Sequence, residues 1–125
     1  MCKKSNAAIY SISMGQYYRL LLEAYGYTSN LDSLEFQMAD NHLRYMSEYT
    51  GGAAYFPRHD SEIPAIVDNI SALLRSQYSI GYVSSNTKKD DKYRKIKVEV
   101  KADLKRNGKP VKFKVKTRKG YIPRH

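Results

Sequence analysis

A row of cationic side chains near the end of the chain is the part of this sequence best suited to chemistry. In VKFKVKTRKGY (111–121) a Lys or Arg alternates with apolar residues or Thr as far as Arg118, and YRKIKVEVKA (93–102) alternates similarly. Successive side chains of a strand point to opposite faces, so both segments predict strands with one apolar and one cationic face. The predicted cationic face comprises Lys95, Lys97, Lys101, Lys112, Lys114, Lys116 and Arg118, with Glu99 among them.

Such a face can bind an anionic partner, either the phosphates of a nucleic acid or an acidic envelope polymer. The alternative is a solvated sheet face whose lysines discourage edge aggregation. Sheets that read single strands usually interleave aromatic residues with the cations, so that bases can stack. Here the aromatic residues fall elsewhere. We therefore favour the solvated face.

Other candidate residues are better explained by structure. His59 and Asp60 adjoin in a predicted loop, but no second His or nucleophile follows at a useful spacing, so Asp60 fits a helix N-cap. Gly51 and Gly52 precede a predicted strand and indicate a helix end, not a phosphate loop. No set of nucleophile, base and oxyanion donors can be assembled. We expect no enzyme, no metal site and no bound cofactor.

The charge of the chain is concentrated in its last third. The 125 residues suit one ordinary domain, and their net charge is +10. Residues 1–87 hold 6 Lys and Arg against 8 Asp and Glu, a net −2, whereas residues 88–125 hold 16 against 4, a net +12. This asymmetry is typical of a local anionic partner or a strongly solvated sheet.

The start of the chain carries no targeting signal that we can recognise. After a basic beginning, Ser residues, Gln16 and Arg19 interrupt the apolar stretch, so we expect neither a signal peptide nor a membrane span. Cys2 is the only cysteine, which excludes an intrachain disulfide and a thiolate metal cluster. The compartment stays open, because bacterial exported domains also lack disulfides.

Residues 1–77 predict alternating strands and helices. AAIYSIS (7–13) and AAYF (53–56) are short apolar runs, the first of which predicts a strand buried on both faces. Between them, residues 16–27 predict a short helix or loop, and residues 34–52 a helix that Gly51 ends. The order of elements favours parallel strand pairing. The predicted inward stripe of the longer helix is Phe36, Ala39, Leu43 and Met46.

A second helix and a change of period follow. RHDSEIPAIVDNISALLRSQ (58–77) predicts a helix with Asp60 or Ser61 as N-cap and Pro64 in the first turn. Its apolar face holds Ile63, Ile66, Val67, Ile70, Leu73 and Leu74. From residue 78 three alternating segments, 78–84, 93–102 and 111–118, predict a three-stranded antiparallel meander with an Asn107–Gly108 turn. Val111, Phe113 and Val115 are predicted to face inward, and Tyr78, Tyr82, Tyr93 and Tyr121 to pack the meander against the α/β part.

An ordered series of short motifs resembles a known family. It begins with Thr50, Gly51 and Gly52, continues with Tyr78, Gly81 and Tyr82, then Tyr93, Arg94, Ile96 and Val98, and ends with Arg118, Gly120 and Tyr121. Over residues 48–123 this series resembles the C-terminal half of the bacterial von Willebrand factor A related domain first described from acidobacteria. The resemblance implies a partial doubly wound, Rossmann-like sheet over residues 1–77, followed by the meander over residues 78–125.

The resemblance also implies what the chain lacks. In von Willebrand A domains a "DxSxS" loop, a Thr and a further Asp hold Mg²⁺, and none of these motifs occurs here. AAIYSIS resembles the fifth strand of that sheet, which follows all three ligand loops. Either the chain is a fragment or truncated reading frame, or a partner chain supplies the rest. We favour the fragment, because missing central strands leave unpaired edges and exposed apolar faces.

Two functional hypotheses follow from these patterns. The first is a non-enzymatic protein-binding or adhesion module that binds a protein or cell-envelope ligand, with Mg²⁺ expected only in the complete family domain. Complete members of the family are expected to be exported. The second is a small basic protein that binds nucleic acid or another anionic polymer through the lysine face.

Overall fold

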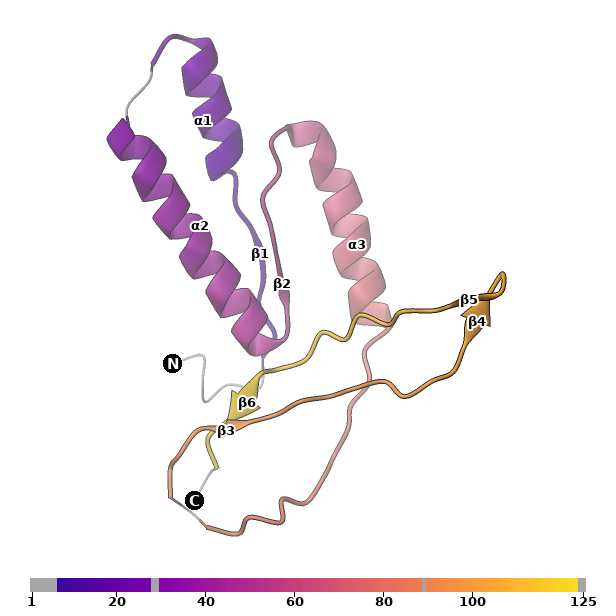
Figure 1. The fold of residues 1–125 in the computed structure, drawn as a ribbon. Coiled ribbons are helices and arrows are strands. Elements are labelled where there is room, and N and C mark those ends of the chain that lie inside the picture. Colours follow the sequence, from indigo (N-terminus) through magenta and orange to yellow (C-terminus); the bar gives the residue numbers. More distant parts are fainter. Residues whose placement is uncertain (1–6, 28–29, 89, 124–125) are drawn as a thin grey trace.

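The computed structural model describes residues 7–27, 30–88 and 90–123, with no side chain described for residues 30–32. The protein is mixed α and β, as the sequence predicts (Figure 1). In chain order its elements are β1 (Tyr10–Ile12), α1 (Gly15–Ala24), α2 (Asn30–Thr50), β2 (Ala53–Tyr55), the 3-10 helix η1 (Asp60–Glu62), α3 (Ile63–Arg75), β3 (Arg94–Lys95), β4 (Lys105–Arg106), β5 (Lys109–Pro110) and β6 (Gly120–Tyr121).

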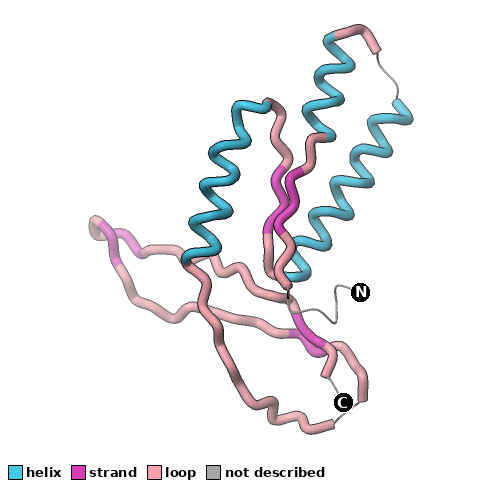
Figure 2. Tube along the Cα trace, turned by 180° about the vertical axis from the view of Figure 1, so that it is seen from behind, coloured by secondary structure: helices cyan, strands magenta, loops and turns pink. Residues whose placement is uncertain are grey.

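A parallel pair of strands lies at the centre of the N-terminal part. Tyr10 pairs with Ala53 and Ile12 with Tyr55, which confirms the predicted parallel pairing. Figures 1 and 2 show α1 and α2 on one side of this pair and α3 on the other. Within the described residues the sheet stops at two strands, so the larger doubly wound sheet that the resemblance implies is not found.

A seam of polar side chains joins β1 to α2. Ser11 Oγ lies 2.8 Å from Ser47 Oγ, and Ser13 Oγ donates a hydrogen bond of 2.5 Å to Asp40 Oδ1. At the other end of the strand, the Ile9 backbone N–H donates to Thr50 Oγ1 over 3.0 Å. Ser11 and Ser13 lie on the same face of the strand because side chains alternate, and residues 40, 47 and 50 share one helix face. We call these five side chains, Ser11, Ser13, Asp40, Ser47 and Thr50, the polar seam.

The predicted inward face of α2 is right for Phe36 and Leu43, which are half-buried, and wrong for the other two residues. Ala39 and Met46 are exposed, while Asp40 and Ser47 are buried. The helix is turned so that its small polar residues meet the serines of β1, because buried hydroxyl and carboxylate groups require hydrogen-bond partners. For the same reason β1 is not apolar on both faces, since Ser11 faces the helix and Ile12 is 39% exposed. None of the described helices is long and apolar enough to cross a membrane.

The end of α2 brings the backbone of β1 very close. Gly51 adopts a φ of +83°, which confirms the predicted helix end at this residue. A Cβ on Gly52 would lie 1.9 Å from the carbonyl oxygen of Ile9, so no residue with a side chain fits there. Gly51 therefore ends the helix and Gly52 allows the close approach of the Ile9 backbone, and the two glycines do not form a phosphate loop.

The helix over 63–75 is confirmed, but its capping residue and the burial of its apolar face differ from the prediction. Neither Asp60 nor Ser61 caps it. Instead the Glu62 carboxylate accepts hydrogen bonds from the backbone N–H groups of Arg58 and His59, each over 3.1 Å. No residue of α3 is fully buried, and Val67 and Leu74 of its apolar stripe are exposed. One apolar side of α3 is therefore only partly covered.

The C-terminal part is an extended arm and not a three-stranded meander. Residues 78–84, predicted as a strand, form no strand. β3 pairs antiparallel with β6, and β4 with β5, in ladders of two residues each. Between these ladders the chain runs out and back over residues 96–119, which we call the arm (Figure 1). At its tip Asn107 and Gly108 have φ values of 53° and 75°, as the predicted hairpin turn requires.

The predicted inward face of the arm is wrong as well. Phe113 is 44% exposed and Val115 38% exposed, although both were expected in a core. The reason is that no third strand forms over 78–84, so no strand covers the apolar side of the arm. Alternation survives at the base of the arm, where Ile96 and Val98 are half-buried and Lys95 and Lys97 exposed.

The polar seam predicts a specific pattern of stability changes. Ser47→Ala should lower the free energy of unfolding by about 1–3 kcal/mol, because it leaves the buried Ser11 hydroxyl without its partner. The double variant Ser11→Ala/Ser47→Ala should be less destabilised than the sum of the two single variants. Urea denaturation followed by circular dichroism would measure all three. Strictly additive effects would show that the two hydroxyls are not coupled.

Candidate functional site

The cationic residues predicted as one face have different surroundings in the structure. Lys95 is exposed in β3 opposite Gly120, and Lys97 forms an ion pair with Glu99. Lys116 Nζ lies 6.0 Å from the ring centroid of Tyr55, and Arg118 is half-buried next to Gly51. Some residues of the predicted row therefore lie at the base of the arm, and the others lie along the arm.

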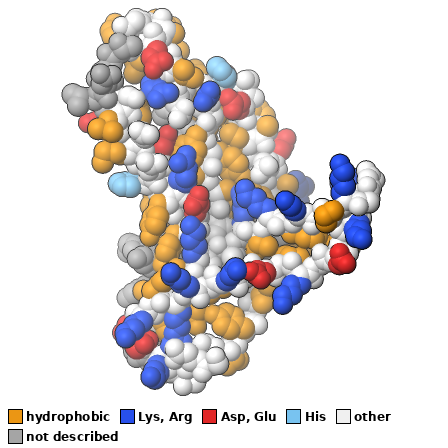
Figure 3. All heavy atoms as spheres, in the orientation of Figure 1, with side chains coloured by type: hydrophobic (Ala, Val, Ile, Leu, Met, Phe, Trp, Pro, Cys, Tyr) orange, Lys and Arg blue, Asp and Glu red, His pale blue; other side chains and the backbone are white. Residues whose placement is uncertain are grey.

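Three lysines of the row remain as a free cationic stretch on the arm. Lys101, Lys112 and Lys114 are exposed and form no ion pair within the described part of the chain. Figure 3 shows Lys and Arg side chains along the arm and around its base, with apolar side chains open to solvent between the two runs of the arm. The arm therefore combines cationic and apolar surface, and it is not a purely solvated sheet face.

The base of the arm is fixed to the α/β part at a group of aromatic residues. The rings of Tyr49, at the end of α2, and Tyr93 stack with centroids 5.5 Å apart. A Cβ on Gly120 would lie 2.2 Å from the carbonyl oxygen of Arg94 and 2.4 Å from Cζ of Tyr93. Only a glycine therefore lets β6 pass this close to β3. We call Tyr49, Tyr93, Arg94, Gly120 and Tyr121 the tyrosine junction.

Arg94 and Tyr121 attach the loop over 82–92 to the same junction. The Arg94 guanidinium donates to Ser84 Oγ over 3.2 Å and to the Asn86 carbonyl, and it forms an ion pair of 3.8 Å with Asp90. Tyr82 and Tyr121 meet edge to face, with centroids 6.4 Å apart. Tyr78, by contrast, is 91% exposed, so its predicted packing role is wrong.

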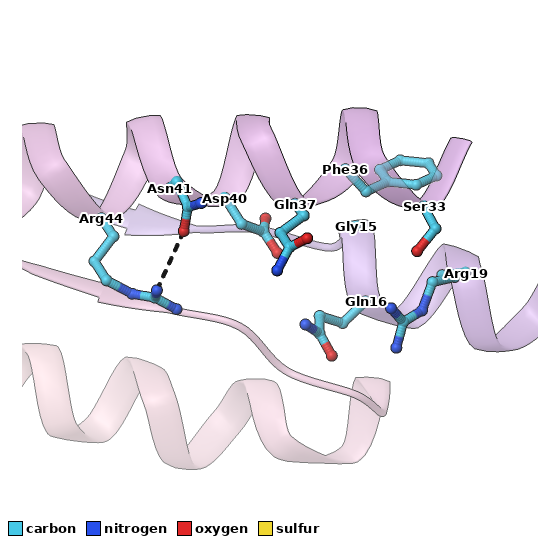
Figure 4. A pocket seen from close by; sticks show the side chains of 9 residues that line it. All are labelled: Gly15, Gln16, Arg19, Ser33, Phe36, Gln37, Asp40, Asn41 and Arg44. Carbon is cyan, nitrogen blue, oxygen red and sulfur yellow. Dashed lines mark hydrogen bonds between the residues drawn. The ribbon is translucent and has the colours of Figure 1, made fainter. Parts of the chain in front are cut away.

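A polar pocket lies between α1 and α2, beyond the carboxyl end of β1. Its volume is about 170 Å³. In Figure 4 the polar ends of Gln16, Gln37 and Asp40 lie between the guanidinium groups of Arg19 and Arg44. Asp40 is only 6% exposed and is held by Ser13, while Arg44 stacks over the Phe56 ring at 4.7 Å. The complete lining is Gly15, Gln16, Arg19, Ser33, Phe36, Gln37, Asp40, Asn41 and Arg44.

The pocket offers positioning groups but no catalytic set. Asp40 lines the pocket and accepts the hydrogen bond of the Ser13 hydroxyl, and no His is among the lining residues to act as a base. His59 and Asp60 are exposed at the start of η1. Within the described residues no group of three or more His, Cys, Asp or Glu side chains could hold a metal ion.

Reasoning from the sequence missed the pocket residues. Gln16 and Arg19 are three residues apart, and so are Asn41 and Arg44, which is helical spacing for one face. This spacing could have indicated two helices with facing polar sides. Only the structure shows that α1 and α2 turn these sides toward each other.

No family model, no curated protein and no solved structure matches this chain. The class of protein therefore rests on the chain itself, which is a small α/β unit with a basic antiparallel arm.

The tyrosine junction predicts a loss of stability at high pH. Burial of the hydroxyl, together with the neighbouring Tyr49, raises the pKa of Tyr93 to about 12. The folded state therefore keeps the proton while the unfolded chain releases it near pH 10, so this part of the stability is present below pH 10 and lost between pH 10 and 12. Urea denaturation across that range should show a steeper decline for the native chain than for Tyr93→Phe. Identical slopes would contradict the role of Tyr93.

Proposed function

We propose that this protein is a non-enzymatic module that binds another protein or an envelope ligand. It is similar in its motif series to the C-terminal part of a von Willebrand A related domain. The observation that carries the proposal is the amount of surface that the folded chain leaves open.

The exposed area is far larger than a compact monomer of this mass would have. The chain of 14.4 kDa exposes 10486 Å². A folded monomer of that mass exposes roughly 6,800 Å², so the excess is roughly 3,600 Å². Tyr49, Ala53 and Pro57 are the buried apolar side chains of the described part, while Val67, Leu74, Phe113 and other large apolar side chains face solvent. Large apolar side chains that face solvent are typical of a protein-binding surface.

Several of the motif residues that carry the family resemblance lie together, which supports the proposal, whereas Tyr78 and Gly81 lie apart from them. Thr50 holds the backbone of Ile9, and Gly51 faces the backbone of Arg118. Tyr93 packs against Gly120 where β3 meets β6. Residues far apart in the sequence thus contribute to one junction between the arm and the α/β part.

Site-specific photo-crosslinking tests the proposal. A photoreactive amino acid at Val67, on the exposed side of α3, should give adducts with another polypeptide in cells that naturally contain the protein. The same group at Lys109, on the exposed tip of the arm, is the matched control and should give few adducts. Mass spectrometry would identify the products. Absence of adducts from Val67, or equal labelling at both sites, would contradict the proposal.

A second candidate function is favoured by the free lysines of the arm. Lys101, Lys112 and Lys114 form no ion pair in the described part of the chain, and residues 88–125 carry a net +12. These residues would bind phosphates of a nucleic acid or carboxylates of an acidic polymer. The exposed Phe113 ring between two of them would offer a stacking surface.

Salt dependence tests this second candidate. Affinity for duplex DNA should be micromolar or tighter at physiological salt and fall steeply as salt rises, because each neutralised phosphate releases counterions. Lys112→Ala/Lys114→Ala should reduce the slope of log affinity against log salt by about 2, roughly one for each lysine. Arg58→Ala/Arg75→Ala removes the same charge outside the arm and should leave the slope nearly unchanged. No binding at low salt would exclude the candidate, and polyglutamate would separate carboxylate from phosphate binding.

A further inference from the structure

The pocket between α1 and α2 contains a buried carboxylate that pairs with no cation of the described residues. Asp40 is 6% exposed, and its one hydrogen bond in the described part of the chain comes from the Ser13 hydroxyl to Oδ1. None of the ion pairs among these residues includes Asp40. A buried charged group is costly unless it is paired, and a carboxylate can accept about four hydrogen bonds. Asp40 is therefore suited to accept a hydrogen bond from a cationic group in the pocket.

Two guanidinium groups border the same pocket and retain unused donors. Arg19 Nε is buried without a hydrogen bond to any described residue, and its ion-pair partner Glu23 Oε1 lies 3.6 Å away on the same helix. Arg44 stacks over the Phe56 ring and donates a hydrogen bond of 3.4 Å to Asn41, a neighbour on α2 (Figure 4). A guanidinium group carries several N–H donors, so both side chains can still bind an anion.

These groups of opposite charge face a space of limited size. In Figure 4 the Asp40 carboxylate and the amides of Gln16 and Gln37 lie between the guanidinium groups of the two arginines. The volume of about 170 Å³ corresponds to about six water molecules, at roughly 30 Å³ each. A single molecule of roughly six to eight non-hydrogen atoms would fill this space. One small molecule can therefore meet the carboxylate and a guanidinium group together.

The charges around this space select among classes of ligand. A metal ion is disfavoured, because the guanidinium groups repel it and Asp40 is the single carboxylate among the described lining residues. A phosphate would place its negative charges against Asp40, and an apolar molecule would leave the polar groups unpaired. An α-amino acid carries a carboxylate beside an ammonium group. It therefore supplies both the anion that arginine binds and the cation that Asp40 lacks.

We propose that the pocket between α1 and α2 binds a small α-amino acid, whose carboxylate meets Arg19 and Arg44 and whose ammonium group meets Asp40. The amides of Gln16 and Gln37, which donate and accept hydrogen bonds, orient the ligand between these charges. No residue of α3 or of the arm belongs to the described lining of this pocket. The amino acid site is therefore separate from the protein-binding function, and either can fail without the other.

Calorimetry with three closely related molecules tests the site on the intact chain. L-Alanine at neutral pH should bind with a dissociation constant of about 1 mM or tighter. Lactate has a hydroxyl in place of the ammonium group, and L-alaninamide has a neutral amide in place of the carboxylate. Each should bind at least about tenfold more weakly than L-alanine, because charge-assisted hydrogen bonds are stronger than neutral ones. Equal affinity for L-alanine and either analogue would overturn the proposal, as would no detectable binding of L-alanine.

Single substitutions test whether binding occurs in this pocket. Arg19→Gln and Asp40→Asn should each weaken the binding of L-alanine at least about tenfold, because each removes one charge that faces the ligand. Arg75→Gln removes the same charge as Arg19→Gln, but on α3, and should bind L-alanine like the native chain. Circular dichroism would show that the helices are retained. Arg19 lies outside the polar seam, so its variant decides the outcome if Asp40→Asn fails to fold. Native affinity in Arg19→Gln, or equal weakening in Arg75→Gln, would overturn the proposal.

Discussion

The polar seam between β1 and α2 is the constraint on which the N-terminal part depends. In most α/β units a helix packs on a sheet through branched apolar side chains, and the separation of the layers follows from their size. Here hydroxyl groups and one carboxylate meet directly, with Ser11 and Ser47 at 2.8 Å. Small residues draw the layers together, and this closeness is why Gly52 has no room for a side chain against Ile9.

A seam of hydrogen bonds specifies geometry more strongly than it adds stability. Each such bond contributes only about 0.5–1.5 kcal/mol net, because it replaces bonds to water, whereas a buried Leu or Phe contributes about 1.5–3 kcal/mol. The register of β1 against α2 is thus well determined while apolar burial stays small. Large apolar side chains are instead exposed on the sides of α1, α2, α3 and the arm and along residues 78–84, Val67 and Phe113 among them. A partner that covered these sides would supply the stabilisation that the seam cannot.

Features set by local chemistry could be predicted from the sequence. Gly51 ends α2, Pro64 stands in the first turn of α3, and Asn107 with Gly108 forms the tip of the arm, because each depends on residues adjacent in the chain. The orientation of α2 could not, because the buried Asp40 and Ser47 are polar, and the rule of apolar periodicity therefore turns the predicted inward face toward Met46. The prediction of the meander was wrong for a different reason. Alternating residues can form a strand only when another strand pairs with them, and residues 78–84 form no strand. For the candidate site, the sequence predicted the row of cationic residues. It did not predict that some of these residues lie at the tyrosine junction and others along the arm.

The tip of the arm has a practical consequence for work with this protein. A Cβ on Gly108 would meet no atom within 4 Å, and Asn107 lies in a turn closed only by the two-residue pairing of β4 with β5. Loop tips of this kind accept inserted residues, because no packed side chain depends on their length. A fluorophore or affinity peptide inserted between Asn107 and Gly108 would stand clear of the polar seam and the pocket. The tip is therefore the natural attachment point for following the protein without disturbing its surfaces.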